Sequence, residues 1–159
     1  LFSMINNIAP YLTNENIYLF ANWGVLPLWL MLIFMPNNNL TKILVNSIFA
    51  PLLIAAAYVF LSYKIYLDGN IFETFNLYLG LENLYAIFSD ENILLIFWLH
   101  FLSISLFVGS WISRDASRYM VPKILTALSL ILTYFSGPLG LVFYWIFRIF
   151  FSKKIGFND

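Results

Sequence analysis

The only histidine of the chain, His100, lies in a run of leucine, isoleucine and phenylalanine that is long enough to cross a bilayer. An ionisable side chain at membrane depth costs free energy, and such residues are therefore functional hypotheses by default. Histidine titrates near neutral pH, so its ring can donate or accept a proton during a reaction. Asp115, just beyond the same apolar run, is the carboxylate available to work with it. The two residues define a candidate catalytic site for proton transfer.

A second hypothesis makes His100 a structural hydrogen-bond donor between two helices. Pro138 has no N–H, so in a continuous helix it leaves the carbonyl of Tyr134 without its intrahelical partner. In lipid that carbonyl needs another donor, and antiparallel register across a short link places His100 level with Ser136. The sequence therefore predicts that His100 points at the last apolar segment, within hydrogen-bond reach of Ser136 or the Tyr134 carbonyl.

Small and polar residues recur at intervals of three and four in the apolar segment that contains His100 and in the last apolar segment. This pattern is typical of close helix packing in membranes. We expect the two faces to meet, because a short link joins the segments and makes them antiparallel. The predicted faces are His100, Ser103, Phe107, Ser110 and Arg114 in one segment, and Thr126, Ser129, Thr133, Ser136 and Gly140 in the other.

Several of these side chains can also recognise a ligand. The tryptophans fit either the aromatic belts at the membrane surface or the walls of an apolar groove. Arg114, Asp115 and Arg118 fit either an interfacial charge cluster or a site for a polar ligand head. No metal site is expected, because the sequence has one histidine and no cysteine. The candidate ligand-binding residues are Trp23, Trp98, Ser103, Trp111, Arg114, Ser136, Gly137 and Pro138.

The elements that must position these residues lie in a membrane. The 159 residues are 62% hydrophobic and 10% charged, whereas soluble domains are about 45–50% apolar and about 25% charged. Eight basic and eight acidic residues give a net charge of zero without a basic stripe, so nucleic-acid binding is not expected. We predict an integral membrane protein.

We predict an all-α membrane protein that forms a single domain over residues 1–159, with four transmembrane helices in two antiparallel hairpins. A span needs about 20 apolar residues, and short polar links join the first span to the second and the third to the fourth. Both termini then lie on the same side of the membrane. The predicted spans are 17–35, 43–63, 93–112 and 124–147.

The connection between the second and third spans is too apolar for an ordinary loop. Its polar residues Glu73, Asn76, Gly80 and Asn83 form a narrow stripe at helical spacing, which predicts an amphipathic interfacial helix over about 71–88. Orientation stays open, because the positive-inside rule needs an asymmetry in basic residues and four lie on each side of the predicted four-helix topology. These are Lys64, Arg148, Lys153 and Lys154 on the terminal side, and Lys42, Arg114, Arg118 and Lys123 on the other.

Four segments resemble, in their order, the abscisic-acid-deficiency-four-like proteins, also called neoxanthin-synthase-like. They are ANWGVLPLWLMLIFMPN (21–37), FAPLL (49–53), AIFSDENILLIFWLHFLSISLFVGSWISRDA (86–116) and LTYFSGPLGLVFY (132–144). The resemblance covers about residues 17 to 147. It implies a small four-helix membrane protein, and its plant members are implicated in converting violaxanthin to neoxanthin in plastid membranes.

The resemblance implies a location in a bacterial inner, thylakoid-type or plastid membrane. It implies a carotenoid or xanthophyll, or another lipid, bound in the bilayer. It also implies an epoxide-opening isomerase with no dissociable cofactor, in which His100 and Asp115 move protons. The chain departs from the family pattern at Ser105, where an acidic residue is usual, and at Ser110, where a basic residue is common. The loss of both members of an acid–base pair leaves open whether this chain is an enzyme.

A second function stays open beside the enzyme. The apolar 64–92 connection and the aromatic lipid-facing surface also fit a non-catalytic small subunit or assembly factor of a larger photosynthetic or respiratory complex. The expected partners are therefore membrane lipids, a carotenoid and a larger membrane complex. Pigment on a small purified particle favours the first function, and comigration with a large complex favours the second.

Overall fold

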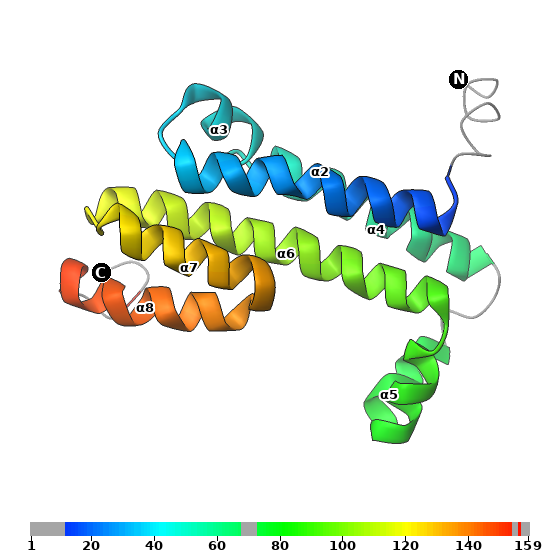
Figure 1. The fold of residues 1–159 in the computed structure, drawn as a ribbon. Coiled ribbons are helices and arrows are strands. Elements are labelled where there is room, and N and C mark those ends of the chain that lie inside the picture. Colours follow the sequence, from blue (N-terminus) through cyan, green and yellow to red (C-terminus); the bar gives the residue numbers. More distant parts are fainter. Residues whose placement is uncertain (1–11, 68–72, 154–155, 157–159) are drawn as a thin grey trace. The chain divides into compact units, whose positions relative to one another are not determined.

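The computed structural model describes residues 12–67, 73–153 and 156, and every regular element in that part of the chain is a helix (Figure 1). The chain divides into two compact units. The first unit comprises Leu1–Gly24 with Leu53–His100, and the second comprises Val25–Leu52 with Phe101–Asp159. The helices are α2 (Asn14–Phe34), α3 (Asn39–Leu44), α4 (Phe49–Leu67), the 3-10 helix η2 (Glu73–Leu79), α5 (Leu81–Phe88), α6 (Glu91–Arg118), α7 (Lys123–Ser136) and α8 (Pro138–Ser152).

Three stretches are long and apolar enough to cross a membrane, namely Asn14–Phe34, Asn39–Leu67 and Glu91–Arg118. They contain nearly all of the first three predicted spans, so these parts of the sequence interpretation agree with the structure. The all-helical class and the membrane character are likewise confirmed. The predicted four crossings and two hairpins are not confirmed, because the last apolar segment is not one long helix.

The predicted fourth span, 124–147, is divided in two at Gly137. Helix α7 ends at Ser136 and α8 begins at Pro138, and Gly137 between them has φ +47° and ψ −85°. That φ is accessible to glycine and strained for other residues. Pro138 takes the first position of α8, where a missing N–H costs no helical hydrogen bond. The sequence predicted a kinked continuous helix here, and the structure has a reversal of the chain.

Helices α7 and α8 run antiparallel and lie side by side in the second unit (Figure 1). Their close approach depends on Gly140, because a Cβ at this position overlaps the backbone of Thr133 and lies 2.6 Å from the Ser129 carbonyl oxygen. Ser129 and Thr133 are fully buried, and each donates its hydroxyl to a carbonyl one turn earlier in α7. The predicted polar face of this segment is therefore a packing face, but it packs against α8.

The predicted polar face of α6 bonds to the start of the second apolar stretch, whereas α6 meets the last apolar segment through other residues, with Ser105 beside Gly137 and Gly109 beside Leu130. Ser103 donates its hydroxyl to the Pro51 carbonyl at 2.9 Å. Ser110 donates to Asn46 Oδ1 at 3.3 Å, and Arg114 donates to the Asn46 carbonyl at 3.1 Å. The expected contact between the two polar faces is therefore wrong for the residues of α6 that belong to the second unit.

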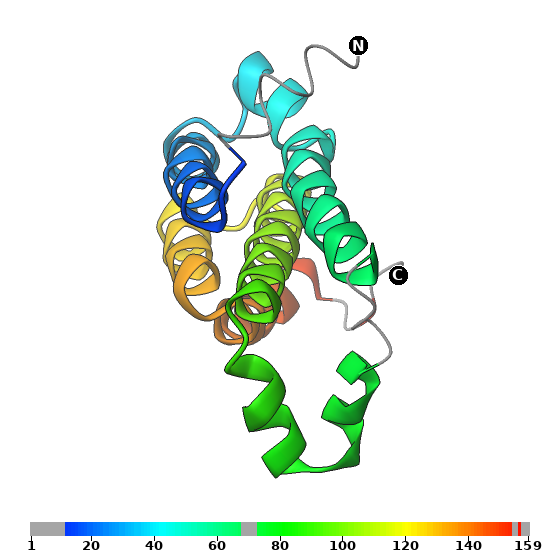
Figure 2. The same ribbon diagram turned by 90° about the vertical axis from the view of Figure 1, so that its right-hand side faces the viewer.

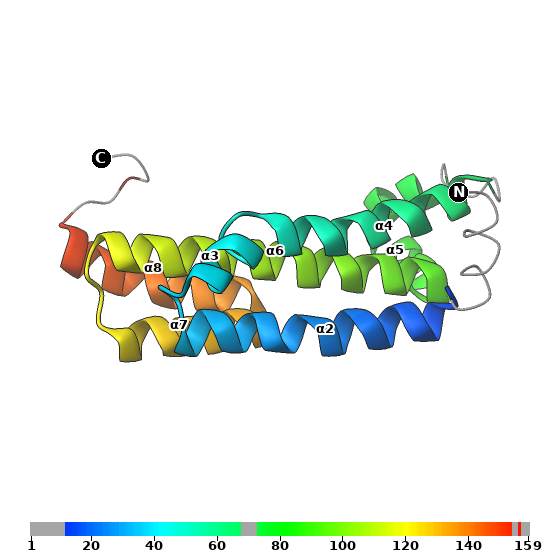
Figure 3. The same cartoon turned by 90° about the horizontal axis from the view of Figure 1, so that it is seen from above.

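The second predicted span begins with a separate short helix. Asn38 caps α3 by accepting a hydrogen bond from the Leu40 N–H, and Thr41 donates its hydroxyl to the Met35 carbonyl at 2.7 Å. Figure 3 shows the turn that separates α3 from α4, where Ile48 has φ +68°. The local polar contacts of Asn38 and Thr41 hold the start of this stretch in place.

The connection between α4 and α6 forms two short helices instead of one. Gly80, with φ +145°, separates η2 from α5, and the two segments meet at an angle in Figure 2. No residue of α5 is buried. Tyr78, Leu81 and Tyr85 are each about four-fifths exposed. The predicted amphipathic segment is therefore present as a broken one, and its position at a membrane interface stays a prediction.

Candidate functional site

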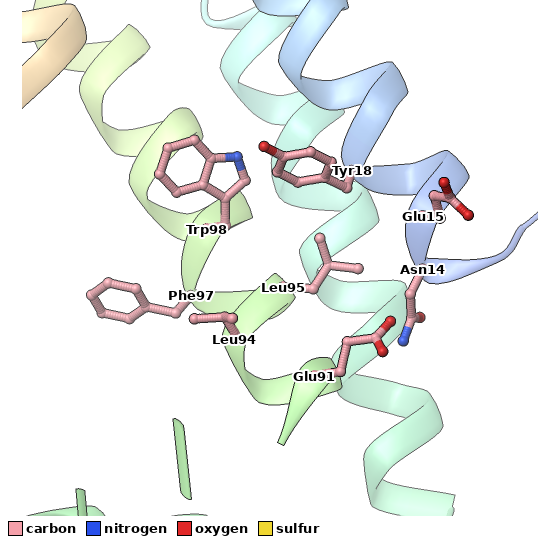
Figure 4. Close-up of a pocket in the computed structure, with 8 residues that line it drawn as sticks. All are labelled: Asn14, Glu15, Tyr18, Glu91, Leu94, Leu95, Phe97 and Trp98. Atoms are coloured by element: carbon pink, nitrogen blue, oxygen red, sulfur yellow. The ribbon is translucent and has the colours of Figure 1, made fainter. Parts of the chain in front are cut away.

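A groove of about 450 Å³ lies in the first unit, between the start of α2 and the start of α6. Ligand sites in proteins usually enclose about 300–1,000 Å³, so the groove has room for a small ligand or for one end of a long one. Figure 4 shows the lining side chains on the first turns of the two helices, with Tyr18 and Leu95 between them. The lining residues are Asn14, Glu15, Tyr18, Glu91, Leu94, Leu95, Phe97 and Trp98.

The aromatic walls of the groove are held in place by packing and by a hydrogen bond. Trp98 donates its indole N–H to Asn22 Oδ1 at 2.9 Å. The ring centroids of Tyr18 and Trp98 are 6.4 Å apart, within the range of favourable aromatic contacts. Leu95 also lines the groove and is 6% exposed. The groove therefore presents a preformed apolar surface beside two aromatic rings.

The carboxylates of the groove lie at the end where α2 and α6 begin. Asn14 donates its amide to Asn92 Oδ1 at 2.8 Å, which joins the first turns of the two helices. Glu15 and Glu91 lie in those same first turns, where carboxylates are favoured by the helix dipole. Asp90 accepts hydrogen bonds from two N–H groups in the first turn of α6. One end of the groove is acidic and the rest is apolar, an arrangement that suits an amphiphile.

His100 lies close to this groove on α6. Its ring centroid is 6.4 Å from the ring of Phe97, which lines the groove, and 6.1 Å from the ring of Tyr58 on α4. The side chain is exposed, and within the described part of the first unit its ring has no hydrogen-bond partner. The predicted partners Ser136 and Tyr134 belong to the second unit, so that contact stays a prediction.

A buried charged cluster lies in the second unit. Asp115 Oδ2 accepts from Arg148 Nε at 2.7 Å and from the Tyr144 hydroxyl at 2.7 Å. Arg148 and Tyr144 are fully buried and Asp115 is 8% exposed. Arg148 also donates to the Gly156 carbonyl and lies over the Tyr119 ring at 4.8 Å. The sequence analysis grouped Asp115 with Arg114 and Arg118, whereas the ion pair of Asp115 in the structure is with Arg148 of α8.

This cluster favours a structural role for Asp115. One carboxylate oxygen accepts two short hydrogen bonds, and both donors come from one face of α8. A buried ion pair is strongly destabilised when one partner is removed, so the cluster ties α8 to the end of α6. Asp115 and His100 belong to different units, and the structure defines no joint site for them.

The other predicted ligand residues do not gather at the groove. Trp98 lines it, while Trp23 on α2 is 69% exposed and is not among the lining residues. Trp111 contacts Tyr144 edge-on at 5.6 Å and stacks on Trp145 at 6.0 Å, beside the charged cluster. Ser103 and Arg114 hold the start of the second apolar stretch. Ser136, Gly137 and Pro138 form the turn between α7 and α8.

Sequence reasoning missed most of the groove and two members of the cluster. The groove residues come from two stretches that are far apart in the chain, and no spacing rule connects them. Tyr144 and Arg148 did carry a signal, because they are four residues apart on one helix face and Arg148 interrupts an apolar run. That signal indicates a buried partner for the arginine, and Asp115 was the available carboxylate.

A family model described as ABA DEFICIENT 4-like matches residues 16–144 of the chain. The match extends from α2 into α8 and includes Tyr18, Trp98, His100 and Asp115. No match was found among curated proteins or among solved structures. The family match agrees with the resemblance found in the sequence and covers well over half of the residues. The chain belongs to the ABA DEFICIENT 4-like family.

Proposed function

We propose that this membrane protein binds a carotenoid in the bilayer, with one end of the pigment in the groove beside Tyr18 and Trp98. The observation that carries the proposal is the groove itself, whose walls are aliphatic and aromatic and whose carboxylates lie at one end. A carotenoid is an apolar rod about as long as the hydrocarbon core is thick, about 30 Å. A xanthophyll adds hydroxylated end rings, which suit the polar end of the groove.

Family membership supports the same ligand class, because the family resembles proteins that are implicated in xanthophyll conversion. The groove adds a physical reason. The flat conjugated polyene beside the end ring gains apolar contact area against the Tyr18 and Trp98 rings, and the burial of that area favours binding. A hydroxyl on that ring can donate to Glu15 or Glu91, whose carboxylates can accept such a bond.

If the bound pigment is also converted, His100 is the residue that we propose to move the proton. Opening an epoxide to an allene breaks a C–O bond, adds a proton to the oxygen and removes a proton from carbon. The composition of the pigment does not change, so neither an oxidant nor a reductant is needed. His100 lies against Phe97 at the groove, and histidine can serve in either proton transfer.

Pigment binding predicts a specific effect of Tyr18→Ala. This variant removes one aromatic wall from a residue that is already 43% exposed, so the fold should be retained. We expect pigment binding to weaken by about tenfold, the equivalent of about 1.4 kcal/mol. The measurement is the ratio of carotenoid to protein absorbance after purification in mild detergent from a carotenoid-producing host.

Phe20→Ala is the matched control for that experiment. Phe20 is on the same helix, is 76% exposed and does not line the groove. Its substitution should leave the pigment ratio unchanged. Equal pigment in Tyr18→Ala and the unmodified protein, or no pigment in either, would remove the groove from the proposal.

The catalytic part of the proposal has its own test in His100→Gln. Glutamine keeps a polar side chain that can donate a hydrogen bond, but it does not transfer protons at neutral pH. We therefore expect the pigment ratio to stay near that of the unmodified protein, while product formation, followed by pigment extraction and chromatography, falls below detection. A His100→Gln protein that converts pigment at the normal rate would leave His100 without a catalytic role.

One observation favours a second function, that of a small subunit in a larger membrane complex. The η2–α5 segment exposes Tyr78, Leu81 and Tyr85, each by about 79–80%, and α5 has no buried residue. Large apolar surfaces of this kind often mark interaction sites. Comigration of the protein with a large complex on a native gel, without pigment of its own, would support this function and exclude the first.

A further inference from the structure

Helices α7 and α8 are each too short to cross a bilayer. They contain 14 and 15 residues, which at about 1.5 Å per residue gives lengths of about 21 and 23 Å. The hydrocarbon core is about 30 Å thick. Because the chain reverses at Gly137 and the two helices pack antiparallel, they form one hairpin that does not reach through the membrane.

The tip of this hairpin has the chemistry of a segment in lipid. No charged residue occurs between Lys123 and Arg148. Phe135 and Leu139, on either side of the turn, are 71% and 55% exposed. The Gly137 N–H donates to the Thr133 carbonyl at 2.8 Å, and the Gly137 carbonyl accepts from the Leu141 N–H at 3.2 Å. Backbone groups with internal partners are what the hydrocarbon region requires.

The ends of the hairpin lie beside the end of α6. Arg148, near the end of α8, bonds to Asp115 in the last turn of α6. Lys123 begins α7 only a few residues after α6 has ended. In Figures 1 and 3, α8 ends alongside the end of α6. The chain therefore enters and leaves the hairpin on the side of the membrane where α6 ends.

We propose that α7 and α8 form a re-entrant hairpin, so that the chain crosses the membrane three times, through α2, the α3–α4 stretch and α6. The start of α2 is bonded to the start of α6 by Asn14 and Asn92. An odd number of crossings then places the start of α2 and the end of α8 on opposite sides. The four-helix topology expected from the sequence placed them on the same side.

The three-crossing topology also separates the charges. In the described part of the chain, six basic residues lie beside the end of α6, and Lys64 and five acidic residues lie beside its start. The positive-inside rule, which had no asymmetry to act on with four crossings, now places the end of α6 in the cytoplasm or its equivalent. The six basic residues are Lys42, Arg114, Arg118, Lys123, Arg148 and Lys153, and the five acidic residues are Glu15, Glu73, Glu82, Asp90 and Glu91.

This orientation has a consequence for the groove. Its acidic end, with Glu15 and Glu91, lies at the start of α2 and α6. The groove therefore opens at the outer surface of the membrane, which is the periplasmic or lumenal side. A ligand is taken from the outer leaflet, whatever its chemical identity. The topology does not depend on the proposed pigment and is tested without it.

Single cysteines test the proposal directly, because the chain has none of its own. Each variant is expressed in a bacterial host and treated, in intact spheroplasts, with a membrane-impermeant maleimide. The same treatment after detergent lysis measures total reactivity. The variants are Ser89→Cys before α6, Asn37→Cys between α2 and α3, Ser136→Cys at the hairpin tip and Asn158→Cys after α8.

The proposal predicts that only Ser89→Cys reacts in intact spheroplasts and that the other three react after lysis. Asn37→Cys is the control, because three and four crossings both place it opposite Ser89. Reaction of Asn158→Cys together with Ser89→Cys would show four crossings and overturn the re-entrant hairpin. Reaction of Asn37→Cys and Asn158→Cys alone would keep the hairpin and overturn the orientation.

Discussion

Gly140→Ala should open the α7–α8 hairpin and destabilise the protein by about 3 kcal/mol or more, at the upper end of the usual cost of overpacking. A Cβ at Gly140 overlaps the backbone of Thr133 and crowds the Ser129 carbonyl, and neither backbone group can rotate away as a flexible side chain would. The two helices must therefore separate. The measurement is the midpoint of thermal unfolding in detergent, compared with that of the unmodified protein.

Gly24→Ala is the matched control in the same chain. Gly24 lies inside α2, and a Cβ there has no heavy atom within 4 Å. Alanine is favoured over glycine inside a helix by about 1 kcal/mol, so this variant should be as stable as the parent or slightly more so. Equal stability of the Gly140→Ala and Gly24→Ala proteins would contradict the close packing of α7 against α8.

Arg148→Met is the second substitution with a large expected effect. It removes the cation that is bonded to Asp115 Oδ2 and leaves a carboxylate that is 8% exposed with only the Tyr144 hydroxyl to compensate it. Breaking a buried ion pair in this way costs about 3–5 kcal/mol. We expect a large fall in the free energy of unfolding, measured by denaturant titration in detergent.

Two further variants show whether that loss comes from the pair. Arg118→Met removes an exposed arginine near the same end of α6 and should change stability by less than about 0.5 kcal/mol. Asp115→Asn combined with Arg148→Met removes both charges and should recover a large part of the loss. If the double variant is as unstable as the sum of the single ones, the two residues do not act as a pair.

The sequence predicted the membrane and the three long helical stretches because apolar length alone decides them. It did not predict the reversal at Gly137, because a Gly-Pro pair inside an apolar run is compatible with both a kink and a turn. What distinguishes the turn from a kink is the positive φ of Gly137 and the contact of Gly140 with α7, and both depend on the tertiary structure. In the three-crossing topology that we propose, this reversal places Arg148 on the other side of the membrane and removes the tie of basic residues.

The candidate site was predicted in part for a related reason. Trp98 and His100 were identified because tryptophan and histidine are conspicuous in an apolar helix, and Trp98 does line the groove. Tyr18 and Glu15 were not identified from the sequence, because they join the groove only through the packing of the start of α2 on the start of α6. Asp115 was grouped with Arg114 and Arg118 on the same helix, whereas its ion pair is with Arg148 and depends on the hairpin.

The measurement that tests pigment binding most directly is native mass spectrometry of the protein, released from detergent after purification from a carotenoid-producing membrane. The proposed function predicts a particle whose mass equals the polypeptide plus one carotenoid, and the Tyr18→Ala protein should show mainly the bare polypeptide. A bare polypeptide from the unmodified protein, in a membrane that contains carotenoids, would contradict the proposed function.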